Sequence, residues 1–202
     1  LQMMGEEPWR IHVTGAPGLD RLRGIATTVW NRPMILVTLH PCTLEYEESE
    51  ATASALVQAL RGFDGIVNWT MANADTYGQR INTILGMAWG TARQTVDAEY
   101  VMLMANASVM VGNSSSGIIE APSFRLPVVN VGNRQKGRLR GDNVIDVPAE
   151  TAAIRDGIRR ALDPAFRAAL SGANPYGDGQ SAPRIAEILQ TVPLDRTLVE
   201  KA

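Results

Sequence analysis

Short runs of β-branched and apolar residues alternate with longer amphipathic runs along the chain of 202 residues. The clearest strand signal is Met34–His40, a nearly continuous apolar run that is typical of a strand buried on both faces. The clearest amphipathic helix is Glu48–Arg61, where apolar residues recur at intervals of three and four and Gly62 supplies a C-terminal cap. This alternation predicts strands that are connected by helices.

The same pattern predicts the other elements in order. Further strands are expected at Ile11–Gly15, Gly65–Met71, Ser108–Gly112, Val128–Val131 and Asn143–Val147. Further helices are expected at Tyr77–Ala88, Asp97–Asn106, Ser115–Phe124, Glu150–Leu162 and Arg184–Gln190. The order predicts an α/β fold, a Rossmann-like parallel sheet with helices on both faces. We expect a single domain over residues 1–202, with ligands beyond the carboxyl ends of the strands.

Composition narrows the class of protein. Apolar residues make up 45% and charged residues 20% of the chain, which is typical of a folded domain. The formal net charge of −2 argues against a general nucleic-acid binder. No apolar run approaches the ~18 residues of a membrane span, and no signal peptide is visible at the start. A single cysteine, Cys42, cannot form an internal disulfide, which favours a reducing, cytoplasmic compartment. Two histidines without a cysteine cluster argue against a metal site.

Polar residues follow the predicted strands. His40 ends the strongest strand, where it could donate to a phosphate or move a proton near pH 7, or equally bond to backbone as a cap. Asn73 and Asp75 follow the strand at Gly65–Met71. These two residue types are common in turns and at helix N-termini, and spacing alone favours that role over contact with a polar ligand.

The most informative segment is Gly112–Glu120, a hydroxyl-rich loop that leads from a strand into a helix. Backbone N–H groups at the helix start and the hydroxyls of Ser114 and Ser115 suit a diphosphate, although serines there could also be caps. Glu120 could accept from the two hydroxyls of a ribose. A capping box would require Ser or Thr where Gly117 stands, which weakens the purely structural explanation of Glu120.

A basic loop follows the next strand. Four cations fall within seven residues, at Arg134, Lys136, Arg138 and Arg140. A run of charged residues is usually exposed to solvent. This loop, however, follows the strand that comes directly after the serine loop, and this position favours a role in binding an anionic ligand. The two loops together predict a nucleoside diphosphate site, although neither GxxxxGK[ST] nor GxGxxG is present.

The run from Val111 to Arg138 resembles the UDP-N-acetylglucosamine 2-epimerases, and most of all their hydrolysing branch, which feeds sialic acid synthesis. Supporting matches in the family's order are Thr14–Asp20, Leu39–Glu45, Asn73–Asp75 and Asn174–Gly179. The resemblance implies two Rossmann-like domains that face a cleft, the glycosyltransferase-B type. The chain resembles only the second, nucleotide-binding half of that fold, without the family's N-terminal domain.

The resemblance also implies roles for individual residues. UDP binding is expected at Asn73, Asp75, Ser114, Ser115, Gly117, Glu120 and Arg134. The serines would bind the diphosphate, Glu120 the ribose hydroxyls, and Arg134 the nucleotide. The catalytic residue expected in this half is His40, which would face the diphosphate–sugar junction and assist departure of UDP.

The reaction implied is elimination of UDP across the first two sugar carbons, followed by addition of water to give N-acetylmannosamine. It requires no metal or redox cofactor. Carboxylates that remove the proton belong to the N-terminal half, so the chain alone is expected to be inactive. The expected partners are a UDP-sugar and either a second copy of the chain or an N-terminal domain, with no nucleic acid and no membrane. Two alternatives remain open: the donor-binding half of a glycosyltransferase, and a non-catalytic nucleotide-sugar binding domain.

Overall fold

The structure, a computed structural model, describes residues 1–27, 31–92 and 97–200. It contains two compact units. Unit 1 comprises Leu1–Arg23 with Tyr176–Ala202, and unit 2 comprises Gly24–Pro175. All strands of the described residues belong to unit 2. That unit 1 and unit 2 together form one domain over residues 1–202 stays a prediction.

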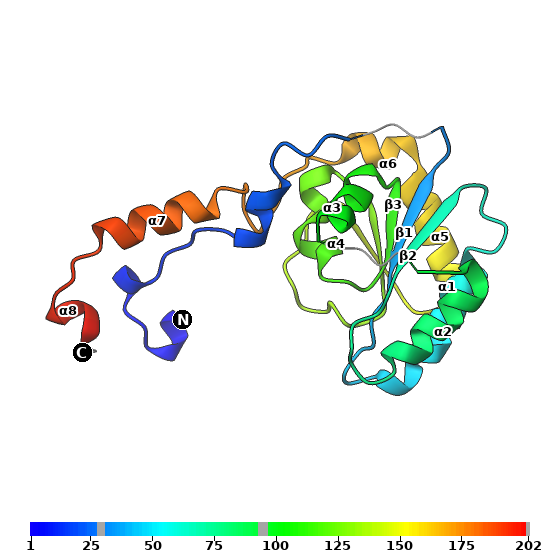
Figure 1. The fold of residues 1–202 in the computed structure, drawn as a ribbon, viewed down its shortest axis with the longest axis horizontal. Helices are drawn as coiled ribbons and strands as arrows, with labels where there is room; N and C mark the ends of the chain where they lie inside the picture. The colour runs from blue at the N-terminus through cyan, green and yellow to red at the C-terminus, as the bar shows by residue number, and fades with distance from the viewer. Residues whose placement is uncertain (28–30, 93–96, 201–202) are drawn as a thin grey trace. The chain divides into compact units, whose positions relative to one another are not determined.

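Unit 2 is built on a five-stranded parallel sheet (Figure 1). Its strands are β1 (Met34–Thr38), β2 (Ile66–Thr70), β3 (Val109–Gly112), β4 (Val128–Val131) and β5 (Val144–Val147). The strand order is β2-β1-β3-β4-β5. Because β1, β3 and β4 are parallel neighbours, their carboxyl ends bring three loops to one edge of the sheet. The predicted Rossmann-like α/β fold is confirmed.

Helices cover both faces of this sheet. One face carries α1 (Ser49–Ala59), α2 (Gly78–Trp89) and α5 (Thr151–Leu162), and the other carries α3 (Asp97–Asn106), α4 (Ser116–Ile119) and the 3₁₀ helix η5 (Ala121–Phe124). Successive side chains of β1 alternate between the two cores: Ile35 and Val37 pack with Leu56 of α1, whereas Leu36 packs with Met104 of α3. Burial of both faces explains why β1 is continuously apolar.

The helix predicted at Ser115–Phe124 is interrupted. The α-helical part, α4, has only four residues, and η5 follows it. Pro122 has no backbone N–H with which to continue the i→i−4 pattern, so the α-helix cannot run through it. Two short elements of unit 2 were not expected from the sequence, namely η4 (Tyr46–Glu48) and α6 (Pro164–Ala169).

Unit 1 consists of η1 (Gln2–Met4), η2 (Pro8–Arg10), η3 (Pro17–Leu22), α7 (Ser181–Thr191) and α8 (Arg196–Val199). The strand predicted at Ile11–Gly15 is wrong, since the segment has no neighbouring strand and Val13 is 95% exposed. The N-terminus of α7 is capped from a distant segment: the Asp20 carboxylate accepts from the backbone N–H of Ser181 (2.9 Å) and Ala182 (2.6 Å). In the described part of the chain, no helix is long and apolar enough to cross a membrane.

Candidate functional site

Three strands of unit 2 deliver the candidate residues to the same edge of the sheet. His40 follows β1, Asn113 follows β3, and Arg134 follows β4. The close approach of β3 to β1 depends on Gly112, which has φ 140° and whose Cα faces the Thr38 carbonyl so closely that a Cβ would lie 2.0 Å from that oxygen. A side chain at this position would push the two strand ends apart.

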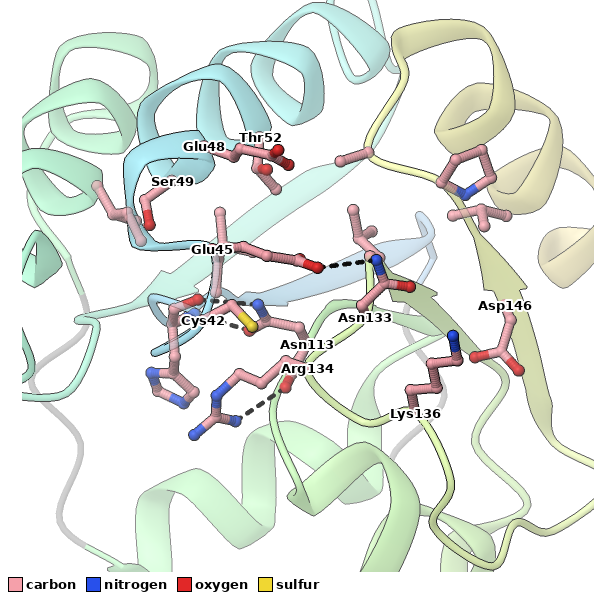
Figure 2. Close-up of a pocket in the computed structure, with 18 of the residues that line it drawn as sticks. Cys42, Glu45, Glu48, Ser49, Thr52, Asn113, Asn133, Arg134, Lys136 and Asp146 are labelled. Atoms are coloured by element: carbon pink, nitrogen blue, oxygen red, sulfur yellow. Dashed lines mark hydrogen bonds between the residues drawn. The ribbon is translucent and has the colours of Figure 1, made fainter.

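Asn113 joins the three loops, and its side chain is buried. Its Oδ1 accepts from the His40 backbone N–H (2.8 Å), and its Nδ2 donates to the His40 carbonyl (2.8 Å). Its backbone carbonyl accepts from Arg134 Nη1 (3.0 Å) and from Gln135 Nε2 (2.7 Å). Figure 2 shows the hydrogen bond between Arg134 and Asn113 as a dashed line. The serine loop and the basic loop therefore meet at Asn113, as the nucleoside diphosphate hypothesis requires.

The His40 ring is held in one tautomer. Its Nδ1 accepts a hydrogen bond from the Asn73 backbone N–H (3.1 Å), so the neutral ring carries its proton on Nε2. The pKa of His40 is lowered to about 4, chiefly by burial and in addition by the nearby Arg134 charge, whereas the Asp75 charge opposes the shift. At pH 7 His40 is therefore a neutral hydrogen-bond donor through Nε2.

Asn73 and Asp75 join the same group. The Asn73 side-chain amide donates to Asp75 (2.5 Å), and the Asp75 charge acts on both His40 and Arg134. The expected alternative role, N-terminal capping of the following helix by a side chain, is absent, because α2 begins after Tyr77 without a side-chain cap. The structure thus brings Asn73 and Asp75 close to His40 and Arg134, for which contacts with UDP are expected.

Arg134 is a cation with incomplete charge compensation. Burial lowers the pKa of its guanidinium, and the neighbouring Arg138 charge lowers it further, whereas Asp75 raises it. An anion beside Arg134 would offset both unfavourable effects. This electrostatic situation favours the binding of a phosphate group.

The remaining predicted residues follow Asn113 along the chain. Ser114 and Ser115 are half-buried, and Ser114 Oγ accepts from Ser116 Oγ (2.9 Å). Ser116 in turn shares a hydrogen bond of 2.5 Å with the Tyr100 hydroxyl. Burial raises the pKa of Tyr100, so this phenol stays protonated and supports the loop. A chain of hydroxyl groups thus holds the serine loop in place.

Gly117 and Glu120 have different surroundings. Gly117 is buried, and a Cβ there would lie 2.9 Å from Val128 Cγ1, so the structure shows a reason of packing for this glycine. Glu120 directly follows α4, and its charge acts on Tyr100. Their predicted contacts with UDP stay predictions.

A pocket of ≈ 560 Å³ opens beside these loops, on the side of α1 and α5 (Figure 2). His40, Asn113 and Arg134 form one wall of the pocket. Its other walls come from the segment Glu45–Thr52, from the basic loop, and from the residues that follow β5. The serine loop therefore reaches the pocket only through Asn113.

Comparison with known proteins gives the family. The family model described as UDP-N-acetylglucosamine 2-epimerase matches residues 1–190. The chain belongs to this family. A UDP-N,N'-diacetylbacillosamine 2-epimerase (hydrolyzing) of Legionella pneumophila is 34% identical over 224 residues, which cover 100% of this chain and 57% of that protein. A UDP-N-acetylglucosamine 2-epimerase of Neisseria meningitidis is 29% identical and is covered to 54%. The chain thus spans little more than half the length of these relatives.

Solved structures agree on the fold. The crystal structure of UDP-GlcNAc 2-epimerase from Neisseria meningitidis bound to UDP-GlcNAc has a TM-score of 0.74 at 17% identity, over 95% of this chain and 58% of that one. A calicheamicin glycosyltransferase has a TM-score of 0.53 at 18% identity, over 84% of this chain and 45% of that one. The fold is that of the second domain of the glycosyltransferase-B type.

For two residues of the candidate site, Asn113 and Gln135, the sequence alone predicts no role. Asn113 lies within the serine loop, and Gln135 lies within the basic loop. Gln135 is 1% exposed although it lies within a charged loop. An uncharged amide inside a run of cations is the one sequence signal that could have indicated a buried, structural position.

Proposed function

We propose that the chain is the UDP-binding half of a hydrolysing UDP-N-acetylglucosamine 2-epimerase, with unit 2 carrying the nucleotide. The observation that carries the proposal is the meeting of the serine loop, the basic loop and His40 at Asn113. The Legionella relative, which is named as hydrolyzing, supports the branch. The substrate class is a UDP-linked 2-acetamido sugar.

The chain's residues stabilise the leaving group in this proposal. Arg134 and the hydroxyls of Ser114 and Ser115 bind the diphosphate, Gly117 contributes its backbone, and Glu120 accepts from the ribose hydroxyls. As the bond between sugar C1 and the β-phosphate oxygen breaks, negative charge develops on UDP, and oriented cationic and N–H donors stabilise it most in the transition state.

His40 acts in this step as a neutral donor. Its Nε2–H is directed at the oxygen that joins the sugar to the β-phosphate, while Asn73 N–H holds Nδ1. The proton lost from sugar C2 goes to a carboxylate outside this chain, and water then adds to the acetamidoglucal to give N-acetylmannosamine. UDP is released as the second product.

Isothermal titration calorimetry with UDP tests the proposal. We expect UDP to bind the pure chain, and we expect Arg134→Ala and Glu120→Ala to weaken binding about tenfold or more, since each removes contacts with a charged or diol group. Absence of heat at millimolar UDP would contradict the proposal. We also expect no N-acetylmannosamine from the pure chain with UDP-N-acetylglucosamine.

Mixing the chain with the N-terminal domain of a relative tests the reaction type. Appearance of N-acetylmannosamine and UDP supports the hydrolysing epimerase. A glycoside product in the presence of an acceptor would instead show a glycosyltransferase.

A further inference from the structure

A series of hydroxyl groups leads from α3 to the proposed diphosphate site. It begins at the phenol of Tyr100 on α3, passes through Ser116 at the start of α4, and ends at Ser114 in the serine loop. Ser116 is buried, whereas Ser114 is half-buried. UDP binding as proposed above uses Ser114 and gives no part to Tyr100 or Ser116.

The hydroxyl of Ser114 is arranged to donate. Its Oγ accepts from Ser116 Oγ (2.9 Å) and from the Ser116 backbone N–H (3.4 Å). A serine hydroxyl has two acceptor positions and one proton to donate. Both acceptor positions of Ser114 therefore face donors of Ser116, and its remaining capacity is that of a donor. A donor at this place is suited to the anionic oxygens of a phosphate.

The proton between Tyr100 and Ser116 comes from Tyr100. Ser116 has one hydroxyl proton, which it donates to Ser114. The Tyr100 oxygen lies 2.5 Å from Ser116 Oγ and 3.4 Å from Thr38 Oγ1, and the shorter contact is the stronger one. Burial raises the pKa of Tyr100, which keeps the phenol protonated at neutral pH. The donors therefore point in one direction, from Tyr100 through Ser116 to Ser114.

A series of donors that point in one direction strengthens its last member. Each hydrogen bond polarises the next hydroxyl and strengthens its hydrogen bond by roughly 10–30%. The phenol has a fixed neighbour, since Thr38 at the end of β1 shares a hydrogen bond of 3.0 Å with Thr70. Ser114 is thus oriented and polarised before a ligand binds. Donors that are oriented in advance stabilise developing negative charge without reorganisation.

We propose that Tyr100 is a positioning residue for the diphosphate: through Ser116 it fixes the Ser114 hydroxyl as a donor to a phosphate oxygen. This inference rests on the proposed function, which places the diphosphate of UDP at Ser114. Tyr100 itself does not touch the ligand. Because it acts on the charge of the diphosphate, its effect should appear with UDP and not with the nucleoside alone.

Isothermal titration calorimetry with UDP and with uridine tests this role in Tyr100→Phe, which removes the hydroxyl and keeps the ring. We expect this variant to bind UDP about threefold to tenfold more weakly than the wild type, while its uridine affinity changes less than about twofold. In a Ser114→Ala background, Tyr100→Phe should weaken UDP binding no further, because the phenol acts through Ser114. Tyr46→Phe is the matched control, because it removes the same group from an exposed residue of η4 and should leave both affinities unchanged.

Three results would overturn the inference while leaving UDP binding intact. These are an unchanged UDP affinity in Tyr100→Phe, an equal loss of affinity for uridine, and a further loss of UDP affinity in the Ser114→Ala background. Absence of UDP binding by the wild type would overturn the proposed function as well. Ser116→Ala interrupts the hydroxyl series in its middle and should reproduce the effect of Tyr100→Phe, so it keeps the test valid if Tyr100→Phe fails to fold.

Discussion

Replacement of Asn113 is the most direct test of how the three loops are joined. Asn113→Ala removes both side-chain hydrogen bonds to the His40 backbone, each 2.8 Å long, and leaves the backbone carbonyl that binds Arg134 in place. A hydrogen bond contributes a net ~0.5–1.5 kcal/mol to stability, so two of them amount to about 1–3 kcal/mol. The side chain is 5% exposed, so water replaces the lost partners poorly.

Urea unfolding followed by far-UV circular dichroism measures this loss. We expect the free energy of unfolding of Asn113→Ala to be lower by about 2 kcal/mol, with an unchanged m-value. Asn133→Ala is the control, because Asn133 is exposed and makes one hydrogen bond with Glu45. Its effect should remain within about 0.5 kcal/mol.

A second measurement shows whether Asn113 positions the His40 ring in addition to stabilising the fold. NMR titration of His40 in the Asn113→Ala chain should show a pKa above that of the wild type, since a ring that is released from the loop becomes more hydrated. If Asn113→Ala matches Asn133→Ala in stability and leaves the His40 titration unchanged, Asn113 does not join the loops in the way that we infer.

Three further predictions concern the same edge of the sheet. Gly112→Ala should destabilise the chain by more than about 2 kcal/mol in urea, because its Cβ would clash with backbone, whereas Gly86→Ala within α2, where a Cβ makes ordinary contacts, should be neutral or stabilising. His40 has a folded pKa of about 4 against the ordinary 6.5, so the unfolded state binds more protons between these values; unfolding free energy should therefore fall as pH drops from 6.5 to 4, and less so in His40→Gln. Salt should weaken UDP binding to the wild type more than to Arg134→Ala; an identical salt dependence would exclude a direct contact of Arg134 with the diphosphate.

Hydrophobic patterning alone predicted the architecture of unit 2, because a parallel strand that is covered on both faces must be apolar along its length, as β1 is. The pattern failed for Ile11–Gly15, which contains three β-branched residues but has no neighbouring strand to pair with. The pattern also predicted too long an α-helix after Ser115. Pro122 lacks a backbone N–H and ends the α-helix, although the residues around it are suited to a helix.

The sequence by itself determined the chemical character of the site: a serine loop, a basic loop and a histidine, each after a strand, in the order that the epimerase family shows. Only the tertiary structure decided how they are joined. The amide of Asn113 contacts His40, which is far away along the chain, and the meeting of Arg134 and Gln135 with the Asn113 carbonyl depends on the pairing of β3 with β4. Such contacts arise from strand order and helix packing, and no local pattern of residues encodes them.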